Sequence, residues 1–260
     1  MNRLLIIILF VIVQTTALSQ AYDSISVDPE LKRVLIDNLG KSWMEDIIPF
    51  ERDEHYNFFA PIYLNNDTLV DFVYYDPSGG EPFMTTIYLN TGNKLEQVKS
   101  GIGSIYRYDK PFLESPSLIH FVEWGCCDDP HNIYQLWTLN NDLISESDQY
   151  HFLEETQLPK DMRYSFSISV QNTPYTLRAT PEIINENFHY HYDKGNIIAE
   201  FSKGDIGHVL STKTDSTGRV WYFVIMEKPS KVGYHNYKIY KDEKWMGWMS
   251  SRFVEIINGR

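Results

Sequence analysis

Two adjacent cysteines, Cys126 and Cys127, are the only thiols of the chain. A nucleophilic cysteine needs a thiolate, which forms where a cation or a helix N-terminus lowers its pKa. Here carboxylates stand on both sides of the pair, Glu123 before it and Asp128 and Asp129 after it, and their negative charge raises the pKa of a thiol. His131 is a possible base, but the run LIHFVEW before the pair is typical of a strand. These residue types therefore disfavour catalysis by this pair.

A zinc site is also disfavoured, because adjacent cysteines in a strand point to opposite faces and no second pair completes a tetrahedron. In an exported protein the thiols meet oxidising conditions. Cα atoms of neighbouring residues lie about 3.8 Å apart, whereas disulfides usually span about 4.4–6.8 Å. We therefore expect a strained, reducible disulfide between Cys126 and Cys127. This bond would force a tight turn after the preceding strand, and Pro130 is compatible with such a turn. The alternative is two reduced, buried cysteines.

Oxygen ligands for a cation are spaced along YLNNDTLVDF, where Asn65, Asp67 and Asp71 occur. This pattern resembles the calcium loop Asp-x-Asn-x-Asp-Gly-x-x-Asp of FG-GAP repeats, although Tyr63 stands at the first Asp and Thr68 at the Gly. The resemblance implies a calcium site. The alternative is an Asn-Asp turn that leads into the next strand. For the protein as a whole we expect no cofactor other than calcium.

Histidines alternate in FHYHYD, so His189 and His191 would share one face of a strand. Two imidazoles so placed are candidate zinc or copper ligands, with Asp193 or His208 as a further ligand. The alternative is an exposed aromatic hairpin.

The first nineteen residues are typical of a secretory leader, with Arg3 before an apolar run and a small-x-small site that ends at Ser19. The run is shorter than the roughly 20 residues of a spanning helix. We therefore expect cleavage before Gln20, a periplasmic or secreted location, and no membrane insertion after cleavage.

The chain carries a formal net charge of −12, and loss of Arg3 would make it −13. Such an acidic protein is a poor partner for nucleic acid or for anionic lipid. Its 260 residues suffice for one or two domains with a full core, and two cysteines are too few for a disulfide scaffold.

One helix is predicted from Asp28, a capping residue, to Gly40. Short runs rich in aromatic and β-branched residues follow, and they predict an antiparallel sheet or sandwich: 55–64, 69–75, 83–90, 118–124 and 133–140. Apolar periodicity fades from Ser145 to Gln157. We therefore predict a β-rich domain over residues 20–157 and a second domain over 158–260, so that the fold class is mainly β with one helix.

The second predicted domain carries turn signals at Lys203-Gly204-Asp205 and at Asp215-Ser216-Thr217-Gly218, and a strand of alternating large residues from Val220 to Met226. Short strands this close together suit a small barrel.

The same region resembles bacterial Src-homology-3 (SH3-like) domains of exported proteins. The resemblance rests on four ordered motifs: Leu177, Arg178 and Pro181; Lys203, Gly204 and Asp205; Trp221, Tyr222 and Val224; and Gly247, Trp248, Ser251, Phe253 and Val254. It departs from the family at two insertions, 183–193 and 227–244. The resemblance implies a small barrel that binds cell-wall peptides or assists a cell-wall enzyme.

Aromatic residues are frequent in the insertions and near them, where Tyr190 and Tyr192 occur. Aromatics on barrel loops would form a recognition groove, or they would cover the small core. The candidate ligand-binding residues are Arg178, Tyr222, Tyr234, Tyr237, Tyr240, Trp245 and Trp248.

These features favour a non-enzymatic binding protein of the bacterial envelope, whose partner is a cell-wall peptide, a glycan or an envelope protein. One alternative is an envelope hydrolase with its chemistry in the first domain. Another is an acidic inhibitor or immunity-type protein, which the negative charge alone supports.

Overall fold

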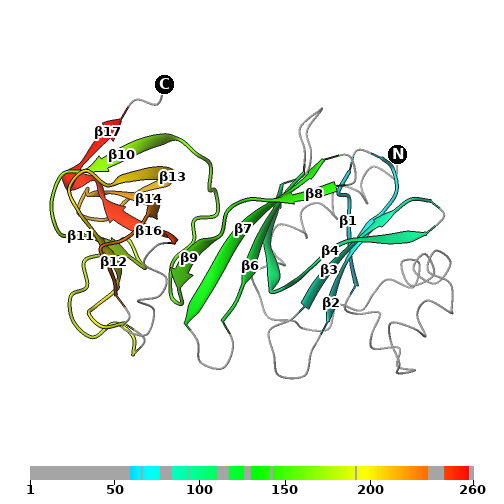
Figure 1. The fold of residues 1–260 in the computed structure, drawn as a ribbon, viewed down its shortest axis with the longest axis horizontal. Coiled ribbons are helices and arrows are strands. Elements are labelled where there is room, and N and C mark those ends of the chain that lie inside the picture. The colour runs from blue at the N-terminus through cyan, green and yellow to red at the C-terminus, as the bar shows by residue number, and fades with distance from the viewer. Residues whose placement is uncertain are drawn as a thin grey trace. The chain divides into compact units, whose positions relative to one another are not determined.

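The computed structural model describes residues 59–65, 67–76, 84–92, 94–109, 117–125, 130–140, 143–190, 192–233 and 243–257. Within these ranges the chain forms strands and one 3-10 turn but no α-helix, so the protein is mainly β, as the sequence predicts (Figure 1). The leader over 1–19 and the helix predicted at 28–40 lie outside the described residues.

Contacts divide the chain into two compact units. The first is Met1–Trp124 with Gln135–Ser147, and the second is Gly125–Tyr134 with Asp148–Arg260. The second unit begins before the predicted boundary at residue 158, because strand β9 (Tyr150–Leu153) pairs in parallel with β16 (Lys244–Ser250). The independent folding of residues 158–260 stays a prediction.

The first unit holds a four-stranded antiparallel sheet in the order β1-β2-β3-β4. Its strands are β1 (Phe59–Ile62), β2 (Asp71–Asp76), β3 (Met84–Asn90) and β4 (Leu95–Ile102). Three further segments are β5 (Ser104–Asp109), which pairs with β6 (Ser117–Glu123), and β8 (Leu143–Glu146), which pairs with the second half of β7 (His131–Asn140). The core of this unit includes Ile87, Phe121 and Trp137, and the last two rings stack with centroids 3.9 Å apart.

The second unit holds strands in the order β17-β10-β13-β14-β16-β9, while β11 pairs with β12 and with β16, and β15 pairs with β12. The strands not yet bounded are β10 (Phe166–Val170), β11 (Tyr175–Arg178), β12 (Ile197–Phe201), β13 (Ile206–Thr214), β14 (Val220–Glu227), β15 (Lys231–Val232) and β17 (Val254–Ile257). A 3-10 turn at Ser251–Phe253 leads into β17. Their inward side chains form one buried cluster that includes Phe201, Val224 and Trp245.

Both turns predicted in this unit are present. Gly204, with φ +96°, lies between β12 and β13, and the Asp205 carboxylate accepts the backbone N–H of Ser202 at 2.7 Å. The β13–β14 hairpin turns at Gly218, with φ +82°, a conformation that suits glycine. Inside that turn Asp215 accepts the Trp221 Nε1–H at 2.9 Å, and such hydrogen bonds, led by that of Thr217, lower the pKa of Asp215. The strand predicted over 220–226 is β14, and it is largely buried.

Candidate functional site

The loop that joins β11 to β12 forms a recess of about 580 Å³. This loop contains the whole of the first predicted insertion, 183–193. The described lining comes from this loop alone and carries side-chain amides, both signs of charge, an imidazole and aromatic rings: Asn185, Glu186, Asn187, Phe188, His189, Tyr190, Tyr192, Asp193, Lys194 and Gly195. Tyr190 is 76% exposed, and its ring lies against that of His189 with centroids 4.4 Å apart. The recess therefore offers an aromatic face beside hydrogen-bonding groups.

Arg178, at the end of β11, fixes this loop through side-chain hydrogen bonds. Its guanidinium donates to the Ile184 carbonyl at 2.9 Å, to the Asn196 side-chain oxygen at 2.7 Å and to the Asn185 side-chain oxygen at 3.0 Å. Arg178 is buried, and burial lowers its pKa below the ordinary arginine value. Three acceptors spread over the loop match the fork of an arginine, so this residue positions the loop and does not face the recess opening.

Asn196, just before β12, ties the other end of the loop. Its side-chain NH₂ donates to the Thr180 hydroxyl at 2.6 Å and to the Glu182 carbonyl at 3.1 Å, and the residue is fully buried. Gly195 beside it has φ +53°, and a Cβ atom there would lie 1.9 Å from the Ile184 carbonyl oxygen. Close passage of the two ends of the loop therefore requires glycine at position 195.

Tyr192 anchors the middle of the loop to the body of the unit. It is 8% exposed, its hydroxyl donates to the Glu154 carbonyl, and its ring meets that of Phe188 edge-on at 5.2 Å. Burial raises its pKa, so it stays a neutral hydrogen-bond donor. The predicted groove residue Tyr192 is thus an anchor, whereas its neighbour Tyr190 is exposed.

Gly233, within the second predicted insertion, lies beside the end of the first. The Asp193 N–H donates to the Gly233 carbonyl at 2.9 Å, and the Gly233 N–H donates to the Ile198 carbonyl at 2.5 Å. A Cβ atom on Gly233 would lie 2.1 Å from the Ile197 carbonyl oxygen, so the chain passes tightly here. The candidate ligand-binding residues Tyr234, Tyr237 and Tyr240 follow at once, and they lie outside the described residues.

The other candidate ligand-binding residues pack within the second unit. Trp245 is fully buried in its core, and Trp248 is 3% exposed and donates its Nε1–H to the Gln157 carbonyl at 2.7 Å. Tyr222 is half-buried, with its ring edge-on to Phe166 at 5.4 Å. These positions favour a packing role, which was the alternative left open for the aromatics, and contact with a ligand stays a prediction.

The candidate calcium ligands lie together, but hydrogen bonds already use their oxygens. Asp71 is fully buried, and its two carboxylate oxygens accept the backbone N–H groups of Leu64 and Asn90 at 2.8 and 2.9 Å. Asp67 accepts the Leu69 N–H at 2.8 Å and the Asn65 side-chain N–H at 2.9 Å. This is the geometry of an Asn-Asp turn.

Burial raises the pKa of Asp71, while its backbone hydrogen bonds lower it. Within the described part of the chain, no group of three or more His, Cys, Asp or Glu side chains has a geometry that would hold a metal ion. Calcium binding at Asn65, Asp67 and Asp71 stays a prediction.

Of the candidate zinc or copper ligands, His191 lies outside the described residues. His189 and Asp193 line the recess, whereas His208 belongs to β13 and is not among the lining residues. The His208 ring lies by Tyr164, with centroids 5.7 Å apart, and within 3.2 Å of the Ser167 hydroxyl. His208 therefore sits in a different polar cluster from His189 and Asp193.

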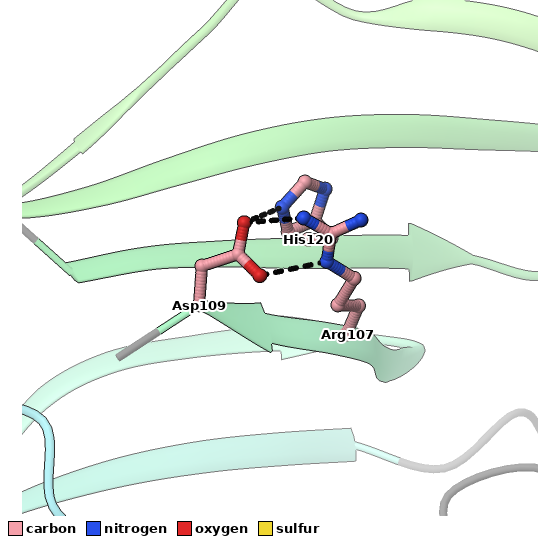
Figure 2. A network of polar contacts seen from close by, with 3 residues as sticks. All are labelled: Arg107, Asp109 and His120. Carbon is pink, nitrogen blue, oxygen red and sulfur yellow. Dashed lines mark hydrogen bonds and ion pairs between the residues drawn. The ribbon is translucent and has the colours of Figure 1, made fainter. Parts of the chain in front are cut away.

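A polar network in the first unit was missed by the sequence analysis (Figure 2). Arg107 and His120 are direct cross-strand partners on β5 and β6, and Asp109 follows Arg107 on the same face of β5. Arg107 donates twice to the Asp109 carboxylate, at 2.7 and 2.5 Å, and His120 Nε2 lies 3.4 Å from the same carboxylate (Figure 2). The sequence contains Arg107 and Asp109 two residues apart, but they indicate this network only when residues 104–109 are paired with 117–123, which brings His120 opposite Arg107.

The electrostatics of this network favour a fixed ion pair. The hydrogen bond from Arg107 lowers the pKa of Asp109, so the carboxylate stays ionised. Burial and the nearby guanidinium lower the pKa of His120, which is 3% exposed. A neutral, buried imidazole held by an ionised carboxylate stabilises the β5–β6 pair, and its low exposure limits its contact with a substrate.

A second histidine cluster lies in the second unit, next to the cysteine stretch in sequence. His131 Nε2 and His151 Nδ1 are 2.5 Å apart, and both residues are buried. Trp245 flanks both rings, with centroids 5.9 Å from His131 and 5.8 Å from His151. From the sequence, His131 was predicted only as a possible base for a thiol. Cys126 and Cys127 lie outside the described residues.

No family model, no curated protein and no solved structure matches this chain. Among the described residues, none of the segments forms a helix with the length and apolar character that a membrane span requires.

Proposed function

We propose that this chain is an exported, non-enzymatic binding protein of the bacterial envelope. Its second unit is an SH3-like domain, and the recess of the 183–195 loop takes a cell-wall peptide, a glycan or a protein partner. The protein works in the periplasm or outside the cell.

The positions of the four resemblance motifs support the SH3-like part of the proposal. Leu177 and Arg178 lie at the end of β11, the Lys203-Gly204-Asp205 turn joins β12 to β13, and the motif beginning at Trp221 lies on β14. Gly247 and Trp248 lie on β16, and Val254 begins β17. Ser251 and Phe253 of the fourth motif lie in the 3-10 turn between these two strands, where the resemblance implies one closing strand.

The recess itself is the observation that carries the binding proposal. Loops that cross a protein surface are usually more mobile than the strands they connect. This loop is held by a buried arginine, a buried asparagine and a buried tyrosine. A loop fixed before binding loses less conformational entropy when the ligand arrives, so the same contacts yield higher affinity.

The lining indicates the chemistry of the ligand. Asn185 and Asn187 supply amides that both donate and accept, Glu186 and Lys194 supply charges of opposite sign, and Tyr190 supplies a flat exposed ring. Peptides and glycans combine hydrogen-bonding groups with apolar faces, and both match this set. The net charge of −12 argues against a nucleic acid as the partner.

The proposal is tested by incubating the purified mature protein with washed cell-wall sacculi and, in parallel, with a lysate from which the wall was removed. Retention on sacculi without release of soluble wall fragments is expected. Release of soluble fragments would instead support a hydrolase, and capture of one basic protein without retention on sacculi would support an inhibitor.

A further inference from the structure

The contact between His131 and His151 is a coplanar, end-to-end pair. Their ring planes differ by 16°, the ring centroids are 4.8 Å apart, and the two nitrogens between them are 2.5 Å apart. Rings stacked face to face would place these nitrogens farther apart. The geometry therefore requires a single proton between the rings, donated by one nitrogen and accepted by the other.

The backbone fixes this geometry. On the antiparallel β7–β9 pair, His131 lies opposite Leu153 and His151 lies opposite Ile133, so the two histidines are diagonal neighbours on one face. On the other side, β9 pairs in parallel with β16, and Trp245 lies directly opposite His151. The histidine pair is thus at the centre of the β7–β9–β16 junction.

Glu243 selects the tautomer of the pair. Its Oε2 lies 3.9 Å from His151 Nε2, which favours a proton on that nitrogen. The Nδ1 of neutral His151 is then the acceptor, and His131 Nε2–H is the donor. In this state both rings are neutral.

We propose that this pair is a two-step acid switch that releases β9 from β16. The first added proton binds His131 Nδ1 while the shared proton moves from His131 Nε2 to His151 Nδ1, so the charge lies on His151 beside Glu243 and an imidazolium–imidazole hydrogen bond persists. The second proton goes to His131 and places two N–H groups, each on a charged ring, against one another. The hydrogen bond is then lost and like charges repel across a buried contact.

The β9–β16 contact is small enough for this loss to open it. Its register covers two residue pairs, Lys244 with Tyr150 and Trp245 with His151. The adjoining ion pair of Lys244 with Asp148, at 2.5 Å, is solvent-exposed and adds little. By contrast, the β14–β16 register covers seven residue pairs and has no histidine in it.

Other titratable groups surround the pair. Among the described residues, those on the elements packed around it are Tyr134 on β7, Tyr150 on β9, Glu154 and Glu155 after β9, Tyr222 and Glu227 on β14, and Asp148, Glu243 and Lys244 at the ends of β9 and β16. None of them contributes an atom to the hydrogen bond between His131 Nε2 and His151 Nδ1, and a variant of His131 that keeps them all separates their effect from that of the pair.

Burial, together with the charge of His151, lowers the pKa of His131 to about 4 from an ordinary value of 6.5. A lowered histidine pKa means that stability is present above 6.5 and is lost as the pH falls toward 4. From His131 alone, the equilibrium constant for opening the junction should rise roughly 100-fold between pH 7 and pH 4.

The test is amide hydrogen exchange of the full mature protein from pH 7 to pH 4, corrected for intrinsic exchange rates. In the wild type, opening should rise roughly 100-fold for Tyr150–Leu153 and Lys244–Met246, and by less than about tenfold for β13 and β14. His131→Gln keeps a donor but cannot take the second proton, so it should lose this rise. The control His208→Gln, on β13 of the same unit, should keep it.

Equal acid opening in wild type and His131→Gln would overturn the proposal, as would β14 opening in step with β9. An NMR titration of the imidazole nitrogens in the wild type decides the matter if His131→Gln does not fold. His151 should take its proton at higher pH than His131, and the reverse order would refute the switch.

Discussion

The guanidinium of Arg178 donates to the side-chain oxygen of Asn196 at 2.7 Å, and both side chains are buried beneath the loop that joins β11 to β12. The two residues close the base of this loop, Arg178 at the end of β11 and Asn196 just before β12. The shape of the recess thus depends in part on two side chains that do not line it, Arg178 and Asn196.

Replacement of Arg178 by Lys should therefore loosen the loop. A lysine ammonium cannot reach the three separate carbonyl and amide oxygens that the guanidinium now binds, so at least one buried acceptor loses its partner. The expected loss is about 1–3 kcal/mol in the free energy of unfolding, measured by urea titration. Arg252→Lys, at an exposed position, is the matched control. Equal stability of the two variants would contradict this role for Arg178.

Asp71→Asn should destabilise the first unit by about 1–3 kcal/mol, because one buried backbone N–H, of Leu64 or Asn90, would then face an NH₂ group. Asp67→Asn, at an exposed position, should cost less. Thermal unfolding with and without millimolar calcium separates the two interpretations of this loop. The turn predicts no calcium effect, and a rise in the wild-type midpoint that both variants lose would establish a calcium site.

Arg107→Gln should raise the pKa of Asp109 and that of His120 together, because the guanidinium lowers both. Since the folded-state pKa of Asp109 lies below its ordinary value of 3.8, its contribution to stability is present above 3.8 and is lost as the pH falls through the folded-state value. Carboxyl and imidazole NMR titrations measure both groups. Unchanged midpoints in the variant would show that the contacts of Figure 2 do not persist in solution.

The disulfide predicted between Cys126 and Cys127 follows from export and from the absence of other cysteines. Alkylation of the denatured, unreduced protein should leave both sulfurs unmodified, and the intact mass should be about 2 Da below that of the reduced chain. Two alkylated cysteines would refute the bond and leave the alternative of two reduced thiols.

Local patterns were sufficient for much of the fold. The aromatic and β-branched runs predicted β1, β2, β3, β6 and β7, since half-buried strands show such composition. They missed β4, whose sequence LEQVKSGI is mostly polar because its side chains are largely exposed or half-exposed. They also missed β9, YHFL, which lies inside a polar stretch and is buried by its partner β16, about ninety residues further along the chain.

The polar sites were harder to predict, because each depends on strand register. Asp109 meets His120 and His131 meets His151 only once β5–β6 and β7–β9 are paired, and no spacing within one segment reveals such a contact. Arg178 was identified, but as a ligand contact. Sequence could not show that its partners Ile184 and Asn196 enclose it, since both approach from a loop without periodicity.

The binding claim is tested most directly by measuring how much of each variant of the mature protein washed cell-wall sacculi retain. Tyr190→Ala removes the exposed ring of the recess, and Tyr164→Ala removes an exposed tyrosine elsewhere in the same unit, with exposed fractions of 76% and 59%. Gly195→Ala adds a Cβ atom 1.9 Å from a carbonyl oxygen, whereas Gly218→Ala imposes a similar left-handed backbone with no atom within 4 Å. We predict that Tyr190→Ala and Gly195→Ala weaken retention at least about fivefold, while Tyr164→Ala and Gly218→Ala bind like the wild type. Wild-type retention by Tyr190→Ala and Gly195→Ala, or the absence of retention by the wild type itself, would contradict the account.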